Sequence, residues 1–454
     1  MTRPSGSERP PTPPRFWWGE ATGSVAAPHQ NPGEVADSVG GVEGDTAMRS
    51  VAIVGMSLAG LRAAETLRRA GFEGRITAIG AESHLPYDRP PLSKELLAGK
   101  WEPDAVVLRK QGVDDLELDW RLGRRAVSLD LAQRQVWLDG TGLDDGEAIS
   151  FDGLVIATGS EPRRLPASAG AHELDGVFVL RTLDDAVAIR GRLDARPKVV
   201  VVGAGFIGAE VAATCRGRGL EVTVLEALPQ PMVRGLGPDI GAVCAALHRD
   251  HGVDMRLGVS VEAIEGDGRV ERVRLADGAV IDADLVVVGI GVVPVTAWLE
   301  GSGLTLSDGV VCDATCLAAP GVVVAGDAAR WPNTLFDGES MRLEHWTNAT
   351  EQGVAAAERL LVADDAAPPF APVPFVWSDQ YDVKIQCVGR FNAGDELHVA
   401  HGTLEERRFV ALFGRAGRLV GALGFSRPRH VMQYRRMISE RRSFADALEH
   451  AADD

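Results

Sequence analysis

The feature that most constrains the fold of this chain is an internal repeat. Residues 51–82 and 199–227 each read as an apolar strand, a glycine-rich turn, a helix and a second strand. In such a unit the glycines let the backbone approach a pyrophosphate, and the N-terminus of the helix meets its negative charge. One glycine pattern alone is weak evidence. Two copies, each ending near an acid, predict two dinucleotide-binding units.

The two glycine turns differ at one position. The second turn and its following acid show the complete pattern, with Gly203, Gly205, Gly208 and Glu226. The first turn has a serine in the middle, in the series Gly55, Ser57, Gly60 and Glu82. Because a serine side chain is small and its hydroxyl can donate to a phosphate, we interpret the first turn as a working site. A degraded turn that binds nothing is the alternative.

Each copy also places an acid at the end of its second strand. A carboxylate at this point accepts hydrogen bonds from the adenosine ribose hydroxyls and repels a 2′-phosphate. Glu82 is therefore a candidate for the ribose of one cofactor. Glu226 is followed directly by Ala227, Leu228 and Pro229 and not by an arginine. The second site is therefore predicted to prefer NADH over NADPH.

A second similarity follows each copy. Residues 136–160 and 273–292 both read as a hairpin, an acid and a buried strand that ends in glycine. We therefore predict an α/β fold with two Rossmann-like nucleotide-binding domains, each carrying a small inserted sheet. One domain is expected to hold a flavin and the other a nicotinamide.

Composition excludes several classes of protein. A net charge of −17 argues against general nucleic-acid binding, and no apolar run approaches the length needed to span a bilayer. The five scattered cysteines predict no metal site and fit a reducing cytoplasm. Residues 1–47 are rich in Pro, Gly and Ser, lack apolar periodicity and show no signal peptide, so we expect disorder there. Met48 is an alternative natural start.

Eight short motifs carry a more specific signal. They are "PYDRPPLSK" (86–94), "LVIATGS" (154–160), "VLRTLDDA" (179–186), "VVGAGFIGAEVA" (201–212), "GIGVVP" (289–294), "AGDAAR" (325–330), "EHWTNATEQG" (344–353) and "WSDQYDVKIQCVG" (377–389). Together these motifs resemble the FAD-dependent ferredoxin reductases that serve bacterial oxygenases, of the putidaredoxin reductase type. The resemblance covers nearly all of the chain from Met48 to about Ser443.

The resemblance implies a glutathione-reductase-like fold with two dinucleotide-binding domains and a C-terminal α+β domain. It assigns residues 48–158 and 289–366 to an FAD-binding domain, 159–288 to an NADH-binding domain, and 367–454 to the C-terminal domain. Asp327 is expected to follow a buried strand, to precede a helix and to hold a ribitol hydroxyl of FAD. A helix N-cap is the alternative role for this aspartate.

The resemblance also implies a catalytic set of Lys94, Glu210 and Trp377. In the family, the lysine lies beside the flavin ring and pairs with the glutamate, and the tryptophan lies between the flavin and the docked ferredoxin. A cation at that point stabilises the negative charge that develops in hydride transfer. The alternatives are a surface lysine in a proline loop and a plain core tryptophan. Further implied cofactor contacts are Ala59, Arg89, Lys94, Ala126, Thr158, Gly159, Arg181, Ile207, Gly291 and Trp346.

The absence of a dithiol constrains where the electrons go. The first cysteine is Cys215, so the "PPLSK" region has no redox cysteine. The chain also lacks a cluster-binding cysteine pattern, so the resemblance implies a separate acceptor, a 2Fe-2S or 3Fe-4S ferredoxin that feeds a monooxygenase or dioxygenase.

The C-terminal segment differs in charge from the rest of the chain. Ile385–Asp454 contains 11 arginines, no lysine and 9 acids, so its net charge is +2 and that of the remainder is −19. We interpret this as a docking face for an acidic ferredoxin, with an ordinary solvated surface as the alternative. The arginines concerned are Arg427, Arg429, Arg435, Arg436, Arg441 and Arg442. A monomer or weak homodimer in the cytoplasm is expected.

Three other functions stay open at this point. An NADH oxidase or peroxidase would use oxygen or peroxide as acceptor, but such relatives usually carry an active cysteine in the "PPLSK" region. Electron delivery to rubredoxin or to a nitrite reductase is the second. The third is an NADH-sensing flavoprotein, which long basic insertions in the C-terminal domain would favour, but this C-terminal domain is short.

Overall fold

The computed structural model describes residues 48–108, 114–140, 146–170, 174–363 and 366–453. The predictions of disorder in residues 1–47 and of a start at Met48 concern a segment outside the described residues. No helix in the described part of the chain is both long and apolar enough to cross a membrane.

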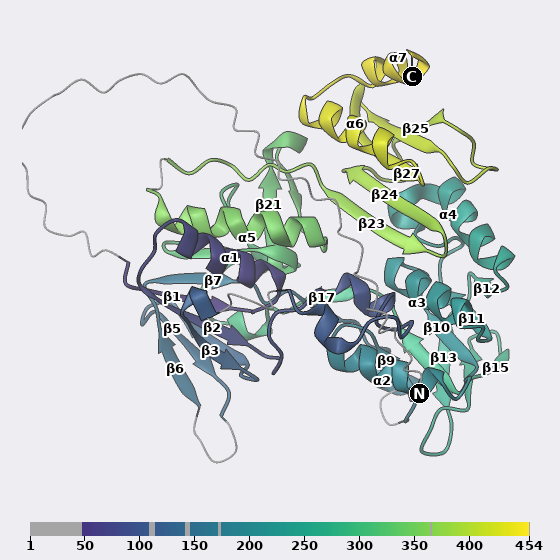
Figure 1. Ribbon diagram of the computed structural model, residues 1–454, viewed down its shortest axis with the longest axis horizontal. Coiled ribbons are helices and arrows are strands. Elements are labelled where there is room, and N and C mark those ends of the chain that lie inside the picture. Colours follow the sequence, from purple (N-terminus) through teal and green to yellow (C-terminus); the bar gives the residue numbers. More distant parts are fainter. Residues whose placement is uncertain (1–47, 109–113, 141–145, 171–173, 364–365, 454) are drawn as a thin grey trace, which may run out of the picture. The chain divides into compact units, whose positions relative to one another are not determined.

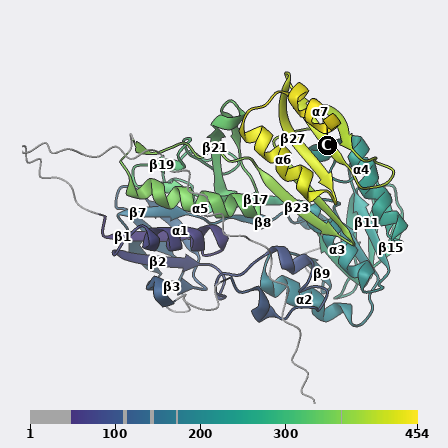
Figure 2. The same cartoon turned by 45° about the horizontal axis from the view of Figure 1, so that its top comes forward.

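The first sheet has six strands in the order β19-β20-β7-β1-β2-β3. Figure 1 labels its strands β7, β1, β2 and β3. Neighbouring strands are parallel except at the β19–β20 edge. The bounds are β1 (Ser50–Val54), β2 (Arg75–Gly80), β3 (Leu118–Leu122), β7 (Gly153–Ile156), β19 (Leu317–Ala319) and β20 (Val322–Val324). Helices α1 (Leu58–Arg69) and α5 (Trp346–Leu361) lie side by side over this sheet in both ribbon views (Figures 1 and 2).

The central strands β1, β7 and β20 are almost wholly apolar because both faces of the sheet are covered there. In β1, Val51 and Ile53 pack with the helices, whereas Ala52 and Val54 pack on the opposite side. Successive side chains of a strand point to opposite faces, so a doubly covered strand has no polar alternation. The second face is covered by two three-stranded sheets, β4 (Ala126–Asp130), β5 (Gln135–Leu138) and β6 (Glu147–Ser150), and β18 (Val310–Val311), β21 (Ala329–Asn333) and β22 (Glu339–Met341).

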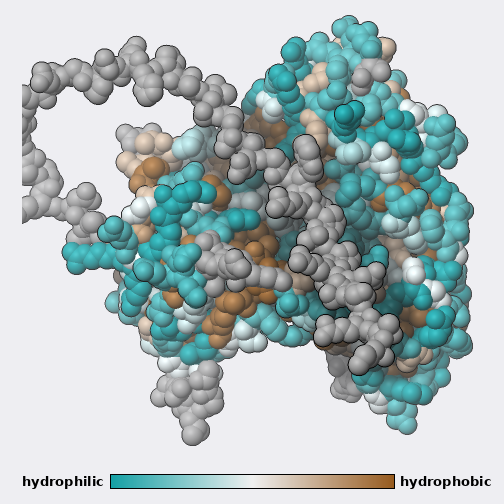
Figure 3. All heavy atoms as spheres, viewed as in Figure 1, coloured by the Kyte–Doolittle hydropathy of each residue, from teal (hydrophilic) through white to brown (hydrophobic). Residues whose placement is uncertain are grey.

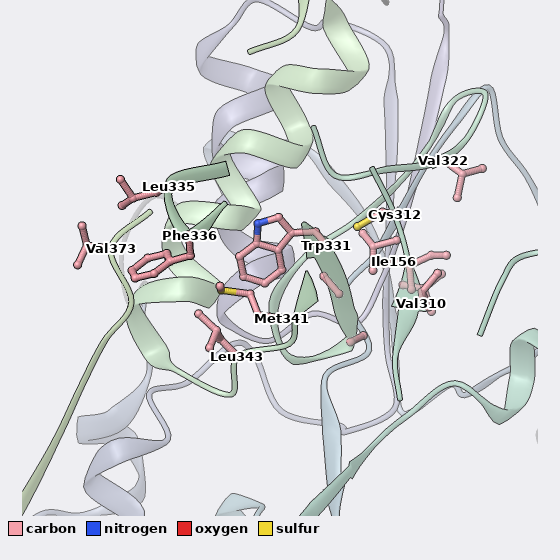
Figure 4. Close-up of a cluster of buried hydrophobic side chains, with 14 of the residues drawn as sticks. Ile156, Val310, Cys312, Val322, Trp331, Leu335, Phe336, Met341, Leu343 and Val373 are labelled. Carbon is pink, nitrogen blue, oxygen red and sulfur yellow. The ribbon is translucent and has the colours of Figure 1, made fainter. Parts of the chain in front are cut away.

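Trp331 is central to the core on this second face. Its side chain is fully buried among Ile156 of β7, Met341 of β22 and other apolar residues (Figure 4). The indole Nε1–H donates to the carbonyl oxygen of Phe370 at 3.1 Å. A buried tryptophan needs such a partner for its only polar group. The contact also fixes the segment that leads toward the C-terminal sheet.

The second sheet has five parallel strands in the order β12-β11-β10-β16-β9. Their bounds are β9 (Val177–Val179), β10 (Val199–Val202), β11 (Val222–Glu226), β12 (Asp254–Leu257) and β16 (Leu285–Val288). Helices α2 (Leu183–Leu193), α3 (Phe206–Gly217) and α4 (Val233–Asp250) accompany it, and β13 (Val261–Glu265), β14 (Arg272–Leu275) and β15 (Val280–Asp282) form a small antiparallel sheet. Thr182 and Asp185 form a capping box at the start of α2, which explains the "TLDD" sequence.

The first and second sheets thus repeat one plan, as the sequence repeat predicts. In each, the glycine turn joins a central parallel strand to a helix, β1 to α1 and β10 to α3, and a small antiparallel sheet precedes a later parallel strand, β7 or β16. The chain passes between the two sheets twice, through the paired strands β8 (Ser160–Pro162) and β17 (Val292–Pro294).

The C-terminal segment forms a five-stranded antiparallel sheet in the order β23-β24-β27-β26-β25. Its elements are β23 (Phe375–Gln380), β24 (Val383–Gly389), β25 (Glu396–His401), β26 (Val410–Arg415), β27 (Arg418–Phe425), α6 (Pro428–Ser439) and α7 (Phe444–Asp453). One face packs against α6 and α7, and the other packs against α4, where Ile385 and Phe425 meet Leu236 and Ile240. The C-terminal sheet is therefore held between its own helices and the second sheet's helix α4.

Short 3₁₀ turns complete the described structure. They are η1 (Pro90–Ser93), η2 (Pro103–Val106), η3 (Asp114–Leu116), η4 (Ala167–Ala169), η5 (Ala297–Leu299), η6 (Gly326–Ala328) and η7 (Thr334–Phe336).

Candidate active site

A cavity of about 660 Å³ opens where the first sheet, the second sheet and the C-terminal sheet meet. Ser57 of the first turn, Gly205 of the second turn and Trp377 of β23 all line it. This volume lies in the range of small-molecule and cofactor sites. The three parts of the chain therefore share one site.

In both turns the first and third glycines are required by close backbone contacts. A Cβ atom on Gly55 would lie 2.1 Å from the carbonyl oxygen of Ala157, and one on Gly60 would lie 2.0 Å from that of Gly55. The second turn repeats the geometry, with 2.3 Å at Gly203 and 2.1 Å at Gly208. Gly55 and Gly203 also have φ of +107° and +101°, which other residues rarely adopt.

The middle positions of the two turns face the cavity. Ser57 and Gly205 both have extended backbone and precede the first residue of a helix. A Cβ on Gly205 would meet nothing within 4 Å, so this backbone is open to a ligand. Ser57 Oγ accepts a hydrogen bond from Arg89 Nε at 3.3 Å, which leaves its own hydrogen available to a phosphate oxygen.

The two strand-end acids are held in different ways. Glu82 Oε1 accepts from Arg89 at 2.7 Å, and its other oxygen accepts from the hydroxyl of Tyr87. Burial raises the pKa of Tyr87, so this hydroxyl stays a donor. Glu226 instead accepts two backbone N–H groups, from Ala204 and Leu228, each at 2.8 Å. Neither carboxylate lines the cavity directly in the described structure.

Lys94 and Glu210 come together in the cavity wall from segments far apart in the sequence. Lys94 follows η1, Glu210 lies in α3, and Lys94 Nζ is 2.8 Å from Glu210 Oε2. Their side chains are 14% and 3% exposed. Ser93 Oγ donates to the same oxygen at 2.5 Å. A nearly buried carboxylate is stable only with such partners, and it keeps the ammonium group at one point.

Two tryptophans adjoin this pair. Trp346, the first residue of α5, donates from Nε1 to Asp88 Oδ1 at 2.7 Å. Its ring meets that of Trp377 edge to face, with 6.0 Å between centroids, and Trp377 stacks on Phe375 at 5.9 Å. Trp377 is half-buried and lines the cavity, so it is not a plain core residue. Burial raises the pKa of Asp88, although the Trp346 hydrogen bond opposes this.

The structure corrects the expectation for the surroundings of Asp327. Asp327 does follow a buried strand, β20, but it lies within the short turn η6, and strand β21 follows in place of a helix. The helix that begins beside this turn is α5, whose Ala349 packs against Gly326. The sequence "AGDAAR" resembles a helix start, but the buried Trp331 that follows pairs in a sheet. The carboxylate of Asp327 accepts from Ser160 Oγ at 2.6 Å and from Arg181 at 3.1 Å.

The remaining predicted contact residues divide into two groups. Those that line the cavity are Ala59, Arg89, Gly159, Arg181, Ile207, Gly208 and Gly291. Thr158 and Ala126 do not line it: Thr158 donates to the carbonyl oxygen of Val295 at 2.8 Å, and Ala126 is buried at the start of β4. Arg89 places a guanidinium group at Ser57 of the first turn, and Arg181 places a second one at Asp327 in the same cavity, so both are available to a pyrophosphate.

Four residues at the site were not singled out from the sequence. Tyr87, Asp88 and Ser93 belong to "PYDRPPLSK", and Ser378 directly follows Trp377. Ser378 Oγ donates to Glu210 Oε1 at 2.8 Å. The motifs indicated the right segments, but the sequence alone did not indicate that Ser93 and Ser378 contact Glu210.

His345 adds an unpartnered polar atom to the cavity wall. Its Nδ1 is buried and has no hydrogen-bond partner among the described residues. Burial lowers the pKa of His345 to about 4, so the ring is neutral at pH 7. A neutral imidazole that lines the cavity leaves one polar atom for a bound molecule.

These observations fit bound dinucleotides. Both turns line the cavity, and the second turn leaves its backbone open at Gly205. Arg89 contacts Ser57 of the first turn, and the Nδ1 atom of His345 has no partner among the described residues. Cys387 is the one cysteine among the described residues that lines the cavity, and burial raises the pKa of its thiol. All five cysteines are buried free thiols.

Two family models match the chain. The model described as "Pyridine nucleotide-disulphide oxidoreductase" matches residues 49–353, and the one described as "Reductase C-terminal" matches residues 375–454. The first match contains both glycine turns, and the second corresponds to the C-terminal sheet with α6 and α7.

Individual relatives agree with these matches. The chain is 38% identical to rhodocoxin reductase of Rhodococcus erythropolis, over 86% of this chain and 89% of that protein. It is 37% identical to the ferredoxin reductase component of chlorobenzene dioxygenase of Cupriavidus sp., over 87% and 94%. Putidaredoxin reductase, solved in covalent complex with putidaredoxin, superimposes with a TM-score of 0.82 at 32% identity, over 89% and 98%. These likenesses confirm the predicted fold class.

Proposed function

The chain belongs to the pyridine nucleotide-disulphide oxidoreductase family, and from this premise we propose that it is an FAD-dependent reductase that passes electrons from NADH to a ferredoxin. The observation that carries the proposal is the shared cavity, where Lys94 and Glu210 form a charge pair between two dinucleotide turns and beside Trp377. No dithiol among the described residues lines that cavity.

The cofactors are assigned to the two glycine turns. FAD belongs to the first turn, in a domain of residues 48–158 and 289–366, where Ser57, Arg89 and Arg181 would hold its pyrophosphate. NADH belongs to the second turn, in a domain of residues 159–288, where the backbone around Gly205 is open. Residues 367–454 form the third domain, which closes the cavity with β23.

Lys94 is assigned an electrostatic role. When bound, FAD accepts a hydride from NADH and returns the two electrons one at a time. A fixed ammonium group beside the ring stabilises the negative charge that this transfer creates, because the site is already organised before the reaction. Glu210 keeps Lys94 at that place, and the proline-rich turn η1 gives its backbone a rigid support.

The thiols of this chain support a ferredoxin rather than peroxide as acceptor. A cysteine reacts as its thiolate, and burial raises the pKa of Cys387, which lines the cavity. An NADH peroxidase would need a reactive thiolate there. The relatives named as ferredoxin reductase components of oxygenases support a 2Fe-2S or 3Fe-4S ferredoxin and, behind it, an oxygenase. The five free thiols support a cytoplasmic location.

Ion pairs within the chain reduce the number of arginines that we assign to the docking face. Four of the six predicted arginines pair with acids of the chain itself: Arg435 with Glu351, Arg436 and Arg442 with Glu440, and Arg441 with Asp337. Arg427 and Arg429, at the start of α6, have no ion pair within the described residues. The surface around α6 and α7, at the upper right of Figure 3, is mostly hydrophilic.

The place of α6 supports docking beside the aromatic group. Arg435 of α6 lies over the ring of Phe375 at 5.7 Å, and Phe375 stacks on Trp377. A ferredoxin that docks at the start of α6 therefore comes near the tryptophan that lines the cavity. Opposite charges would orient this encounter and raise its rate.

The test of the function is NADH oxidation by the FAD-loaded protein with and without a 2Fe-2S ferredoxin. Cytochrome c serves as the final acceptor, and oxygen uptake is recorded in parallel. Cytochrome c reduction that requires ferredoxin, with slow oxygen uptake, supports the proposal. Rapid oxygen uptake without ferredoxin would identify an oxidase instead.

The charge pair is tested in the same assay. Lys94→Ala should slow flavin reduction by NADH about 100-fold, which is the usual loss when one preorganised donor is removed. Lys100→Ala, an exposed lysine in the same segment, is the control. Equal rates in both variants would refute the role of Lys94.

The docking face is tested with two charge reversals on one helix. Arg429→Glu should raise the KM for ferredoxin about tenfold at low ionic strength and leave kcat unchanged, and added salt should reduce the difference. Arg436→Glu is the control, because Arg436 is 81% exposed and already pairs with Glu440. An equal effect of both reversals would show that only overall charge matters.

A further inference from the structure

Glu210 accepts hydrogen bonds from two separate segments of the chain, residues 93–94 and 378–379. Its Oε2 accepts from Ser93 and Lys94 on the FAD side, at 2.5 and 2.8 Å. Its Oε1 accepts from Ser378 Oγ at 2.8 Å and from the backbone N–H of Asp379 at 3.3 Å, both on β23. One nearly buried carboxylate on α3 thus joins the first sheet's segment to the C-terminal sheet.

The contact with Ser378 belongs to a longer hydrogen-bonded chain. Gln380 Nε2 lies 3.2 Å from Ser378 Oγ, and Gln380 Oε1 lies 3.1 Å from His248 Nε2. His248 Nδ1 lies 2.9 Å from the hydroxyl of Tyr381. Ser378 and Gln380 are fully buried, and His248 is 2% exposed, so water does not replace these partners.

The direction of this chain follows from the carboxylate. A carboxylate only accepts, so the single hydroxyl hydrogen of Ser378 points to Glu210. Ser378 Oγ must then accept from the amide NH₂ of Gln380, which turns the Gln380 oxygen toward His248. His248 therefore carries its hydrogen on Nε2, and its Nδ1 accepts from Tyr381. Every donor in the chain points toward Glu210.

The protonation of His248 agrees with this direction. Burial lowers the pKa of His248 to about 4, so the ring is neutral at pH 7 and has one N–H. His248 lies in α4 of the second sheet, whereas Gln380 and Ser378 lie in β23. This series of hydrogen bonds therefore connects β23 to α4 through His248 and to α3 through Glu210.

Ser378 also adjoins the acceptor side of the cavity. It directly follows Trp377 in β23, and the strand is held there by its pairing with β24, with Trp377 opposite Gln386. A shift of Ser378 along the strand would shift Trp377 by the same amount. Glu210 thus binds Lys94 through one carboxylate oxygen and β23, the strand that carries Trp377, through the other.

We propose that Ser378, oriented by Gln380 and His248, is a positioning residue that fixes Glu210 and Trp377 in one geometry for both halves of the reaction. The proposal rests on the proposed function, because it gives Glu210 and Trp377 their roles. A displacement of about 1 Å in a positioned group can lower the rate by a large factor. Loss of the Ser378 hydrogen bond should therefore move Glu210, and with it Lys94, and slow the reaction. Substrate binding should be spared, because Ser378 does not line the cavity.

The experiment uses the FAD-loaded full chain and three variants. Ser378→Ala removes the donor to Glu210, and Gln380→Met removes the donor that orients Ser378. Thr66→Ala is the control, because Thr66 is a buried hydroxyl in α1 that contacts Arg69 away from the cavity. Stopped-flow absorption gives the limiting rate of flavin reduction and the Kd of NADH. Visible circular dichroism reports the surroundings of the bound flavin without turnover.

We expect Ser378→Ala to lower the limiting rate about tenfold and to change the Kd of NADH by less than about twofold. Gln380→Met should lower the rate by a smaller factor, and the double variant should match Ser378→Ala, because both act through one contact. The circular dichroism of the flavin should change in Ser378→Ala and stay unchanged in Thr66→Ala.

Two results would overturn the inference. The first is a Ser378→Ala variant whose rate and circular dichroism equal those of Thr66→Ala. The second is a double variant whose losses multiply, because the two residues would then act separately. Failure of the proposed function looks different: the unmodified protein itself would not reduce its flavin with NADH, and the inference would fall with it.

Discussion

The two glycine turns share one backbone and differ in what they present to the cavity. In both, a Cβ atom placed on the first or the last glycine of the turn would lie only 2.0 to 2.3 Å from a backbone oxygen. The middle position is free of such contacts in the second turn and is a serine in the first. The outer glycines are therefore required by the fold, whereas the fold does not require a glycine at the middle position of the second turn.

The strand-end acids extend the comparison. Glu82 is held by two side chains, Arg89 and Tyr87, whereas Glu226 is held by two backbone N–H groups. The first turn thus depends on the "PYDRPPLSK" segment to complete its site. The second turn is complete within its own strand–turn–helix unit.

The largest effect is expected at the outer glycines. Gly60→Ala should destabilise the protein by about 3 kcal/mol or more, because its Cβ would overlap the carbonyl oxygen of Gly55. Gly208→Ala should do the same through Gly203. Thermal unfolding and FAD content measure both. Gly217→Ala is the control, since nothing lies within 4 Å of that site. A Gly60→Ala variant as stable as Gly217→Ala would show that the close contact at Gly60 is not required.

The next effect is expected at the second acid. Glu226→Ala should reduce the preference for NADH over NADPH about tenfold or more, because a carboxylate no longer repels the 2′-phosphate. The measurement is kcat/KM for both cofactors. Glu82→Ala should leave that ratio unchanged and lower the affinity for FAD instead. A preference that survives Glu226→Ala would remove this assignment.

Exchanging the middle residues should have a smaller effect. Gly205→Ser should not change the unfolding temperature, because no protein atom lies within 4 Å of the new Cβ atom. It should weaken NADH binding about tenfold, because the side chain enters the cavity beside the ligand and, unlike Ser57, has no arginine partner. Ser57→Gly should change FAD affinity less than about threefold, since only the contact with Arg89 is lost. Titration calorimetry measures both. A drop in unfolding temperature in either variant would mean that the fold also depends on the middle position.

The smallest effect is expected at a glycine outside the turns. Gly191 lies in α2 with nothing within 4 Å of its absent Cβ. Gly191→Ala should stabilise the protein by roughly 0.5 to 1 kcal/mol, because alanine loses less backbone freedom in a helix. Chemical denaturation checks this gain. A loss of stability would show that open space around a glycine is not enough to predict tolerance.

Much of the fold was predictable because its signals are local. The glycine turns and the apolar strands each follow from residues a few positions apart. The prediction of a helix after Asp327 was wrong because it also depended on a local signal alone. The turn "AGDAAR" resembles a helix start, but the burial of Trp331 in β21 overrides it.

The candidate site was predictable in part. The motifs and their family resemblance indicated Lys94, Glu210 and Trp377, and the structure brings all three to one cavity. Ser378 and Asp88 lie inside quoted motifs, but their contacts depend on how separate segments meet. The pairing of most C-terminal arginines with acids of the chain was likewise invisible in the net charge of that segment.

Short stretches of the sequence are enough to specify two dinucleotide units, an acid at the end of each, and a "PPLSK" segment without a redox cysteine. Backbone sterics and apolar burial act over a few residues, so they can be read from a short stretch of chain. Only the tertiary structure decided that Glu210 is shared by Lys94 and Ser378, and that His248 supports this contact from another helix. A buried carboxylate must find donors wherever packing places them, and that is settled by the docking of whole sheets and helices.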